Sequence, residues 1–146
     1  MSQAAEFTAP YRLEYPYKRG LGPVLGAFFT GLRSGQLVGV RSAQGEVFCP
    51  PTEFHPKDAQ ALTELVPLTG QGTVETVYWI ERPAPHHPIQ RPFGFARVRL
   101  DGSDSFFVHA LDTQGDSSLA QSGLRVAPRW RAERQGMARR LRGAGR

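Results

Sequence analysis

The sequence has one cysteine and no long apolar stretch. Cys49 is the only cysteine among 146 residues, so the chain cannot form an internal disulfide bond. No run reaches the roughly 18 apolar residues of a membrane-spanning helix. Residues 1–7 also lack the basic and then apolar pattern of a secretory signal. These absences predict a cytoplasmic protein without a membrane span.

The usual sequence signatures of metal binding and catalysis are also missing. There is no C-x2-C pair, whereas a structural zinc site needs closely paired cysteine or histidine ligands. His86 and His87 are adjacent, and neighbouring side chains of an extended chain point apart. Cys49, before Pro50 and Pro51, is more typical of a small buried hydrophobic residue than of a nucleophile. We therefore expect no stoichiometric metal or cofactor and no catalytic residue in this chain.

The positive charge is concentrated at the C-terminal end. Residues 129–146 contain seven arginines and one acid, Glu133, whereas residues 1–128 contain 11 basic and 12 acidic side chains. A uniformly basic domain would favour nucleic acid as a ligand. A near-neutral body with a basic end instead favours an acidic protein surface or a phosphate group, and argues against nucleic acid.

The N-terminal quarter of the chain predicts an extended arm followed by an amphipathic helix. Residues 1–17 contain prolines and aromatic residues without any period, and residues 18–35 hold apolar residues at helical spacing. Pro23 suits the first turn of this helix and Gly35 its end. Phe28 and Phe29 lie about 100° apart, so we expect one to face the body and the other a partner. The apolar stripe comprises Leu21, Val24, Leu25, Phe28, Phe29 and Leu32.

The rest of the chain predicts short strands. Residues 36–64 contain two of them, 37–41 and 46–49, joined by a turn, and residues 132–146 form a basic tail. Residues 65–131 are rich in β-branched and aromatic residues and predict a small Greek-key barrel. The strands expected in this region are 73–80, 93–100, 105–111 and 124–130, with Asp101-Gly102 as a turn.

Four polar side chains of the predicted barrel are candidates for binding or packing. Arg97 and Arg99 share one face of a strand, and Arg91 precedes them. This face is interpreted either as a solvated outer surface or as a surface for phosphate groups and stacked bases. His109 shares a strand face with two apolar residues, so we expect it to be packed.

Several motifs occur together in an order that is typical of one family. Gly39, Gly45, Pro50 and Pro51 fit a pattern of glycine, C-x2-C-G, a short strand, P-P and a second C-x2-C. In this spacing the four cysteine positions are taken by Arg41, Gln44, Phe54 and Lys57. Further matches are Gly70-Gln-Gly72-Thr-Val-Glu-Thr, the stretch from Pro92 to Gly102, and Gly123-Leu-Arg-Val126.

With these motifs, residues 18–131 resemble a family of acyl-CoA-associated zinc-ribbon and OB-fold proteins, the domain-of-unknown-function family thirty-five. The resemblance implies a mainly β fold: an OB-fold barrel (65–131) with an N-terminal helix (18–35) and a zinc-ribbon-like hairpin (36–64). Without the cysteine ligands the hairpin is degenerate and metal-free, and apolar packing by Val40, Val47 and Phe54 must hold it.

The resemblance also implies a function. Members of this family accompany thiolases, acyltransferases and lipid-transfer-protein-like thiolase homologues, some of which are aldolases acting on steroid side-chain CoA thioesters. We therefore expect a non-catalytic accessory subunit in a hetero-oligomer with such an enzyme, with acyl-CoA as the ligand of the complex. The expected partner-binding residues are Leu25, Phe28, Phe29, Leu32, Trp130 and Arg131, and Arg91, Arg97 and Arg99 are candidates for the CoA phosphates.

Two other functions are considered. One is a single-stranded nucleic-acid-binding OB-fold protein, which the charge distribution argues against. The other is an independent hydrolase or thioesterase, which would need a nucleophile and a base that the sequence does not offer.

Overall fold

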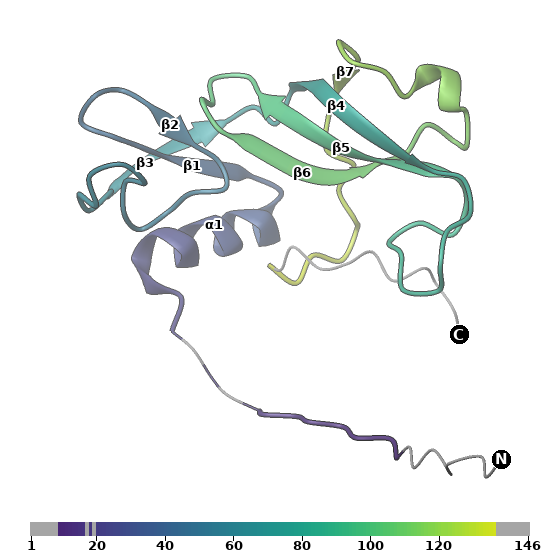
Figure 1. Cartoon of the computed structure of the whole chain (residues 1–146). Helices are drawn as coiled ribbons and strands as arrows, with labels where there is room; N and C mark the ends of the chain where they lie inside the picture. Colours follow the sequence, from purple (N-terminus) through teal and green to yellow (C-terminus); the bar gives the residue numbers. More distant parts are fainter. Residues whose placement is uncertain (1–8, 17, 19, 137–146) are drawn as a thin grey trace, which may run out of the picture.

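The computed structural model describes residues 9–16, 18 and 20–136, so most of the predicted basic tail lies outside the described residues. The described part contains one α-helix, seven strands and a short 3-10 helix (Figure 1). They are α1 (Gly22–Ser34), β1 (Leu37–Arg41), β2 (Val47–Phe48), β3 (Glu64–Leu68), β4 (Gly72–Ile80), β5 (Phe93–Leu100), β6 (Phe106–Leu111), η1 (Ser117–Leu119) and β7 (Arg125–Val126).

Helix α1 begins later than the predicted segment 18–35, because Gly22 and Pro23 open its first turn. It ends where Gly35 takes a positive φ of 76° and donates its N–H to the carbonyls of Gly31 and Leu32. At 13 residues it is about 20 Å long. Since a bilayer core is about 30 Å thick, the described residues include no helix able to span a membrane.

The first sheet has the strand order β2-β1-β3 and is antiparallel. The middle strand, β1, places Val40 opposite Phe48 on one side and Leu65 on the other. Val40 is fully buried. β3 starts at Glu64, where the sequence predicted the end of the hairpin, and pairs with β1.

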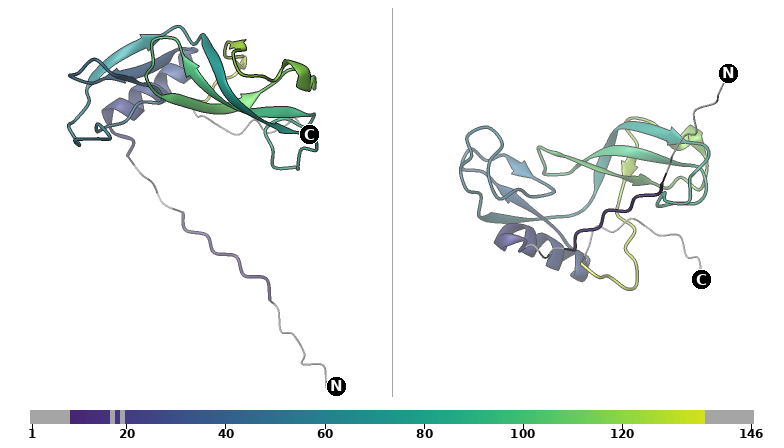
Figure 2. Two further views of the ribbon diagram at one scale, coloured as in Figure 1. Left: turned by 45° about the horizontal axis from the view of Figure 1, so that its top comes forward. Right: turned by 60° about the horizontal axis from the view of Figure 1, so that its bottom comes forward.

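The second sheet has the order β6-β5-β4-β7 and curls into a half-barrel (Figures 1 and 2). Along β5, buried Ala96, Val98 and Leu100 alternate with exposed Arg97 and Arg99, as the sequence pattern predicted. β7 has only two residues, much less than the predicted strand 124–130. The mainly β, OB-like fold with an N-terminal helix is therefore confirmed, with an open half-barrel in place of a closed barrel.

One face of α1 connects both sheets. Val24 packs with Val40 and Leu62 in a small cluster under the first sheet. One turn later, Phe28 belongs to the larger cluster with Val74 and Ala96 of the half-barrel. The whole larger cluster consists of Phe28, Leu37, Cys49, Val74, Ala96, Val98 and Leu100.

Replacing Phe28 by Ala should lower the free energy of unfolding by about 3–5 kcal/mol, because Phe28 is 2% exposed and its ring fills the core. Urea unfolding followed by circular dichroism measures this loss. Thr30→Ala, at an exposed position of the same helix, serves as the control and should change stability by about 0.5 kcal/mol or less. Equal effects of the two variants would contradict the role given to Phe28.

Candidate functional site

The four positions at which the family resemblance implies zinc-ligand cysteines hold side chains that cannot bind the metal together. Arg41 forms an ion pair with Glu64 at 2.8 Å, and Lys57 bonds Glu46 at 3.1 Å. Phe54 is 62% exposed, so the expectation that it packs inside the hairpin is wrong, whereas Val40 and Val47 are buried as predicted. Among the described residues, no group of three or more histidine, cysteine, aspartate and glutamate side chains is arranged to hold a metal.

A hydrogen-bonded cluster around His55 links the two turns instead. His55 is 5% exposed, and its Nε2 lies 2.9 Å from Glu46 Oε2. Its Nδ1 lies 2.9 Å from Asp58 Oδ1. The bond from His55, followed by that from Lys57, lowers the pKa of Glu46 below its ordinary 4.5. Glu46 therefore stabilises the fold above about pH 4.5, and this contribution is lost as the pH falls through its lowered pKa.

Chelation should leave this hairpin intact, and removal of the His55 ring should not. We expect no stoichiometric zinc by elemental analysis and no change of melting temperature in EDTA, because the ligand positions are occupied by other side chains. His55→Ala should lower the free energy of unfolding by about 1–3 kcal/mol, as for a buried hydrogen bond to a charged group. Lys57→Ala, which removes an exposed partner, is the control with little effect. About one zinc per chain would contradict this account.

Cys49 is fully buried, as predicted, and is not an activated nucleophile. Its backbone N–H donates to Ser105 Oγ at 2.7 Å, and Ser105 Oγ donates to the Cys49 carbonyl at 3.0 Å. Burial raises the pKa of the Cys49 thiol to about 12. Since the thiolate is the reactive form, Cys49 serves the core and offers no covalent chemistry.

Thiol labelling tests this directly. At pH 8 an Ellman-type reagent should leave the folded chain unmodified, because pH 8 lies far below the pKa of about 12 for Cys49. The same chain in urea should react at once, which controls for the reagent. Labelling of the folded chain at the rate of a free cysteine would show that Cys49 is accessible and ionised.

The three arginines considered for CoA phosphates do not come together. Arg97 and Arg99 lie side by side on β5 and share one carboxylate, Glu75, at 3.6 and 2.7 Å. The Arg97 guanidinium also lies 3.3 Å from the centre of the Phe106 ring. Arg91 instead bonds Asp112, just beyond the end of β6.

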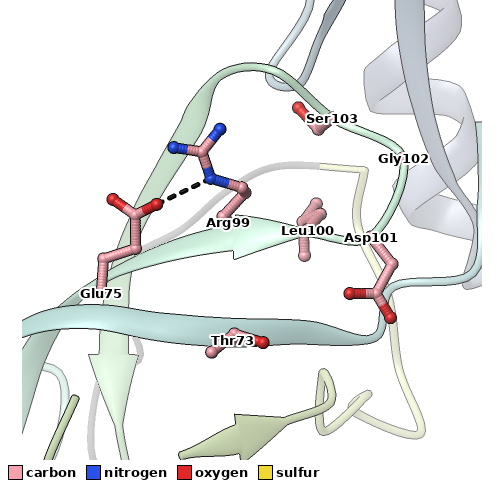
Figure 3. A pocket seen from close by; sticks show the side chains of 7 residues that line it. All are labelled: Thr73, Glu75, Arg99, Leu100, Asp101, Gly102 and Ser103. Atoms are coloured by element: carbon pink, nitrogen blue, oxygen red, sulfur yellow. Dashed lines mark hydrogen bonds and ion pairs between the residues drawn. The ribbon is translucent and has the colours of Figure 1, made fainter. Parts of the chain in front are cut away.

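The outer face of the sheet beside Arg99 is shallow and its charges are paired. Figure 3 shows the Arg99–Glu75 ion pair above Thr73, next to the turn at Asp101. Asp101 is in turn held by Arg125, with nitrogen–oxygen distances of 2.8 and 2.5 Å. The hollow between them has a volume of about 490 Å³. Arg99 and Arg125 are each held by a carboxylate at this hollow, Glu75 and Asp101, and these carboxylates repel a phosphate group there.

The partner-binding residues expected on α1 fall into two parallel stripes. Val24, Phe28 and Gly31 form the buried stripe, so Phe28 faces the core of its own chain. The neighbouring stripe, which we call the helix stripe, consists of Leu25, Phe29 and Leu32 and is half-buried. Phe29 touches Phe28 edge to face, with ring centres 5.4 Å apart. Of the two phenylalanines, Phe29 packs on the edge of the large core cluster and keeps part of its ring exposed.

The C-terminal segment 127–136 lies beside the end of α1. Trp130 is 37% exposed and approaches Gly35, and the Arg131 carbonyl accepts a bond from Arg134 at 3.0 Å. Arg134 also donates to the Arg33 carbonyl at 3.1 Å. These contacts place Trp130 and Arg131 next to the helix, although they lie about 100 residues away in the sequence.

A groove of about 1370 Å³ separates this segment from the concave face of the half-barrel. Leu32 and Trp130 line it on one side, and Arg91, Asp112 and Arg129 on another. Asp112 binds both arginines, and the bond from Arg91 is the main cause of its lowered pKa. No sequence pattern predicted this groove, because it is lined by alternating strand residues and by a segment without a period. Its floor consists of Ala96, Val98, Leu100, Phe107, Leu111 and Val126.

No family model matches the sequence, and no curated protein matches it. Solved structures do match. A DUF35-family protein of unknown function from Sulfolobus solfataricus has a TM-score of 0.52 at 18% identity, over 61% of this chain and 68% of that one. A structure described as the Ltp2-ChsH2(DUF35) aldolase has a TM-score of 0.57 at 18% identity, over 85% of this chain and 93% of that one. The chain has the DUF35 fold.

This likeness confirms the family resemblance at the level of the fold. The likeness to the second structure extends over 85% of the chain. In this version of the fold the His55 cluster occupies the hairpin, and the half-barrel leaves its concave groove open.

Proposed function

We propose that this protein is a non-catalytic accessory subunit of an acyl-CoA enzyme of the aldolase or thiolase type. The observation that carries the proposal is the half-buried helix stripe, which adjoins an open apolar groove. A surface of this kind is typical of an obligate or long-lived protein interface. The likeness to the Ltp2-ChsH2(DUF35) aldolase over 85% of the chain supports an aldolase as the partner.

The catalytic partner in this proposal is a thiolase-like, lipid-transfer-protein-like subunit that cleaves steroid or lipid side chains as CoA thioesters. Its own residues carry out the chemistry. This chain contributes the helix stripe together with Trp130 and Arg131 as the interface in a hetero-oligomer. The groove then lies beside the interface, where its apolar floor suits the acyl part of a thioester.

Arg91 is the best placed of the three arginines for a CoA phosphate. It lies on the rim of the groove with Arg129, and the two cations share the single carboxylate of Asp112. One positive charge therefore remains there, and an anion can be held next to it. Arg97 and Arg99 face the opposite side of the sheet and are paired with Glu75. The near-neutral charge of residues 1–128 speaks against the alternative of a single-stranded nucleic-acid-binding protein.

Purification from the native cell tests the proposal. The tagged full-length chain should bring down a thiolase-family protein in stoichiometric amount, identified by mass spectrometry. The isolated chain should show no turnover of acyl-CoA substrates, and the complex should remain active with Cys49→Ala. Recovery of the chain alone, or acyl-CoA turnover by the isolated chain, would contradict the accessory role.

Phe29→Ala should weaken binding of the catalytic partner by about 2 kcal/mol, which is about 30-fold in Kd, as for an aromatic anchor. The reason is that Phe29 is the aromatic residue of the helix stripe that its own core does not enclose. Isothermal titration with the purified partner gives the Kd. Thr30→Ala, next to Phe29 but exposed, is the matched control and should bind normally. Unchanged binding by folded Phe29→Ala would place the interface elsewhere.

A further inference from the structure

The outer edge of the half-barrel is a long strand without the usual protection. Among the residues that the structure describes, β6 pairs only with β5 and ends the sheet on its side. Its six residues, Phe-Phe-Val-His-Ala-Leu, include no proline and no lysine, arginine or carboxylate. Val108 is 69% exposed at its centre, and His109 is also exposed, which corrects the expectation that this histidine is packed. Edge strands of soluble proteins usually carry charges, prolines or bulges that prevent pairing.

The other strand edges of the described residues do carry such features. β2 and β7 have two residues each, too short to receive a strand. β3 contains Pro67, which has no N–H to donate. The register shift between Val74 and Thr76, in the pairing of β4 with β5, bends β4, and beyond it the shorter stretch 76–80 remains unpaired on the β7 side. Within the part of the chain that the structure describes, β6, with six residues, is therefore the longest edge open to strand addition.

We propose that β6 pairs with β6 of a second copy of this chain, antiparallel, about a twofold axis perpendicular to the sheet. Such an axis keeps the concave faces of both copies on the same side, so equivalent residues meet. In the register that centres on Val108, this side chain lies opposite the second copy's Val108. Phe107 then lies opposite the second copy's His109, both on the concave face.

A second copy suits this edge because the strand is uncharged. An antiparallel twofold pairing places each residue near its own equivalent, so a charged strand would repel itself. β6 brings no such repulsion, and its β-branched and aromatic residues favour cross-strand contacts. The pairing also extends the antiparallel order of β6, β5 and β4 without a change of direction. The result is one sheet of eight strands across two chains.

The molecular mass in solution tests the pairing. By sedimentation equilibrium from about 1 to about 100 µM, the full chain should behave as a dimer of 16.1 kDa subunits. Val108→Lys should raise the dimer Kd at least about tenfold, because it places two ammonium groups face to face. Its exposure of 69% means that the monomer still folds. Tyr78→Lys, on the same convex face but on β4 and 72% exposed, is the matched control and should dimerise normally.

A cysteine at the twofold axis tests the register. Val108→Cys should form an intermolecular disulfide under mild oxidation, because directly opposite residues of an antiparallel pair lie about 4.5–5.5 Å apart. Tyr78→Cys should not, and buried Cys49 gives no background. The proposal is overturned if the wild-type chain remains monomeric at about 100 µM, if Val108→Lys dimerises like the wild type, or if Val108→Cys fails to crosslink a dimer.

Discussion

The structure depends on one helix that belongs to two hydrophobic cores at once. Val24 lies in the small cluster under the first sheet, and Phe28, one turn later, lies in the large cluster of the half-barrel. A further link between the sheets is polar: Asp104 and Ser105, in the turn between β5 and β6, bond the backbone of Val47 in β2 and of Cys49 just after it. Because the buried stripe of α1 is committed to its own chain, only the helix stripe beside it remains for a partner.

The parts of the fold that follow from local sequence patterns could be predicted. α1 was visible from its apolar period and from Gly35, which takes the left-handed conformation that ends a helix. β5 was visible because apolar and arginine residues alternate, and a half-exposed strand requires that alternation. The family motifs gave the order of the segments. All of these signals lie within a few neighbouring residues.

The parts that depend on contacts between distant segments could not be predicted. β3 has no clear period and contains Pro67, so nothing in it revealed that it would pair with β1. Arg97 and Arg99 looked available for phosphate until the structure placed Glu75 of the neighbouring strand between them. Trp130 reaches α1 through a segment with almost no regular structure. In each case the decisive partner is more than 20 residues away, beyond the reach of a pattern search.

The His55 cluster makes the hairpin independent of supply from outside the chain. A ribbon built on four thiolates folds only as fast as the cell delivers zinc, and oxidants that attack the thiolates release the metal again. Here the two turns are joined by an imidazole and carboxylates that belong to the chain itself. Folding can therefore proceed in metal-starved or oxidising conditions. The corresponding weakness lies in acid, which protonates the Glu46 carboxylate that holds the ring.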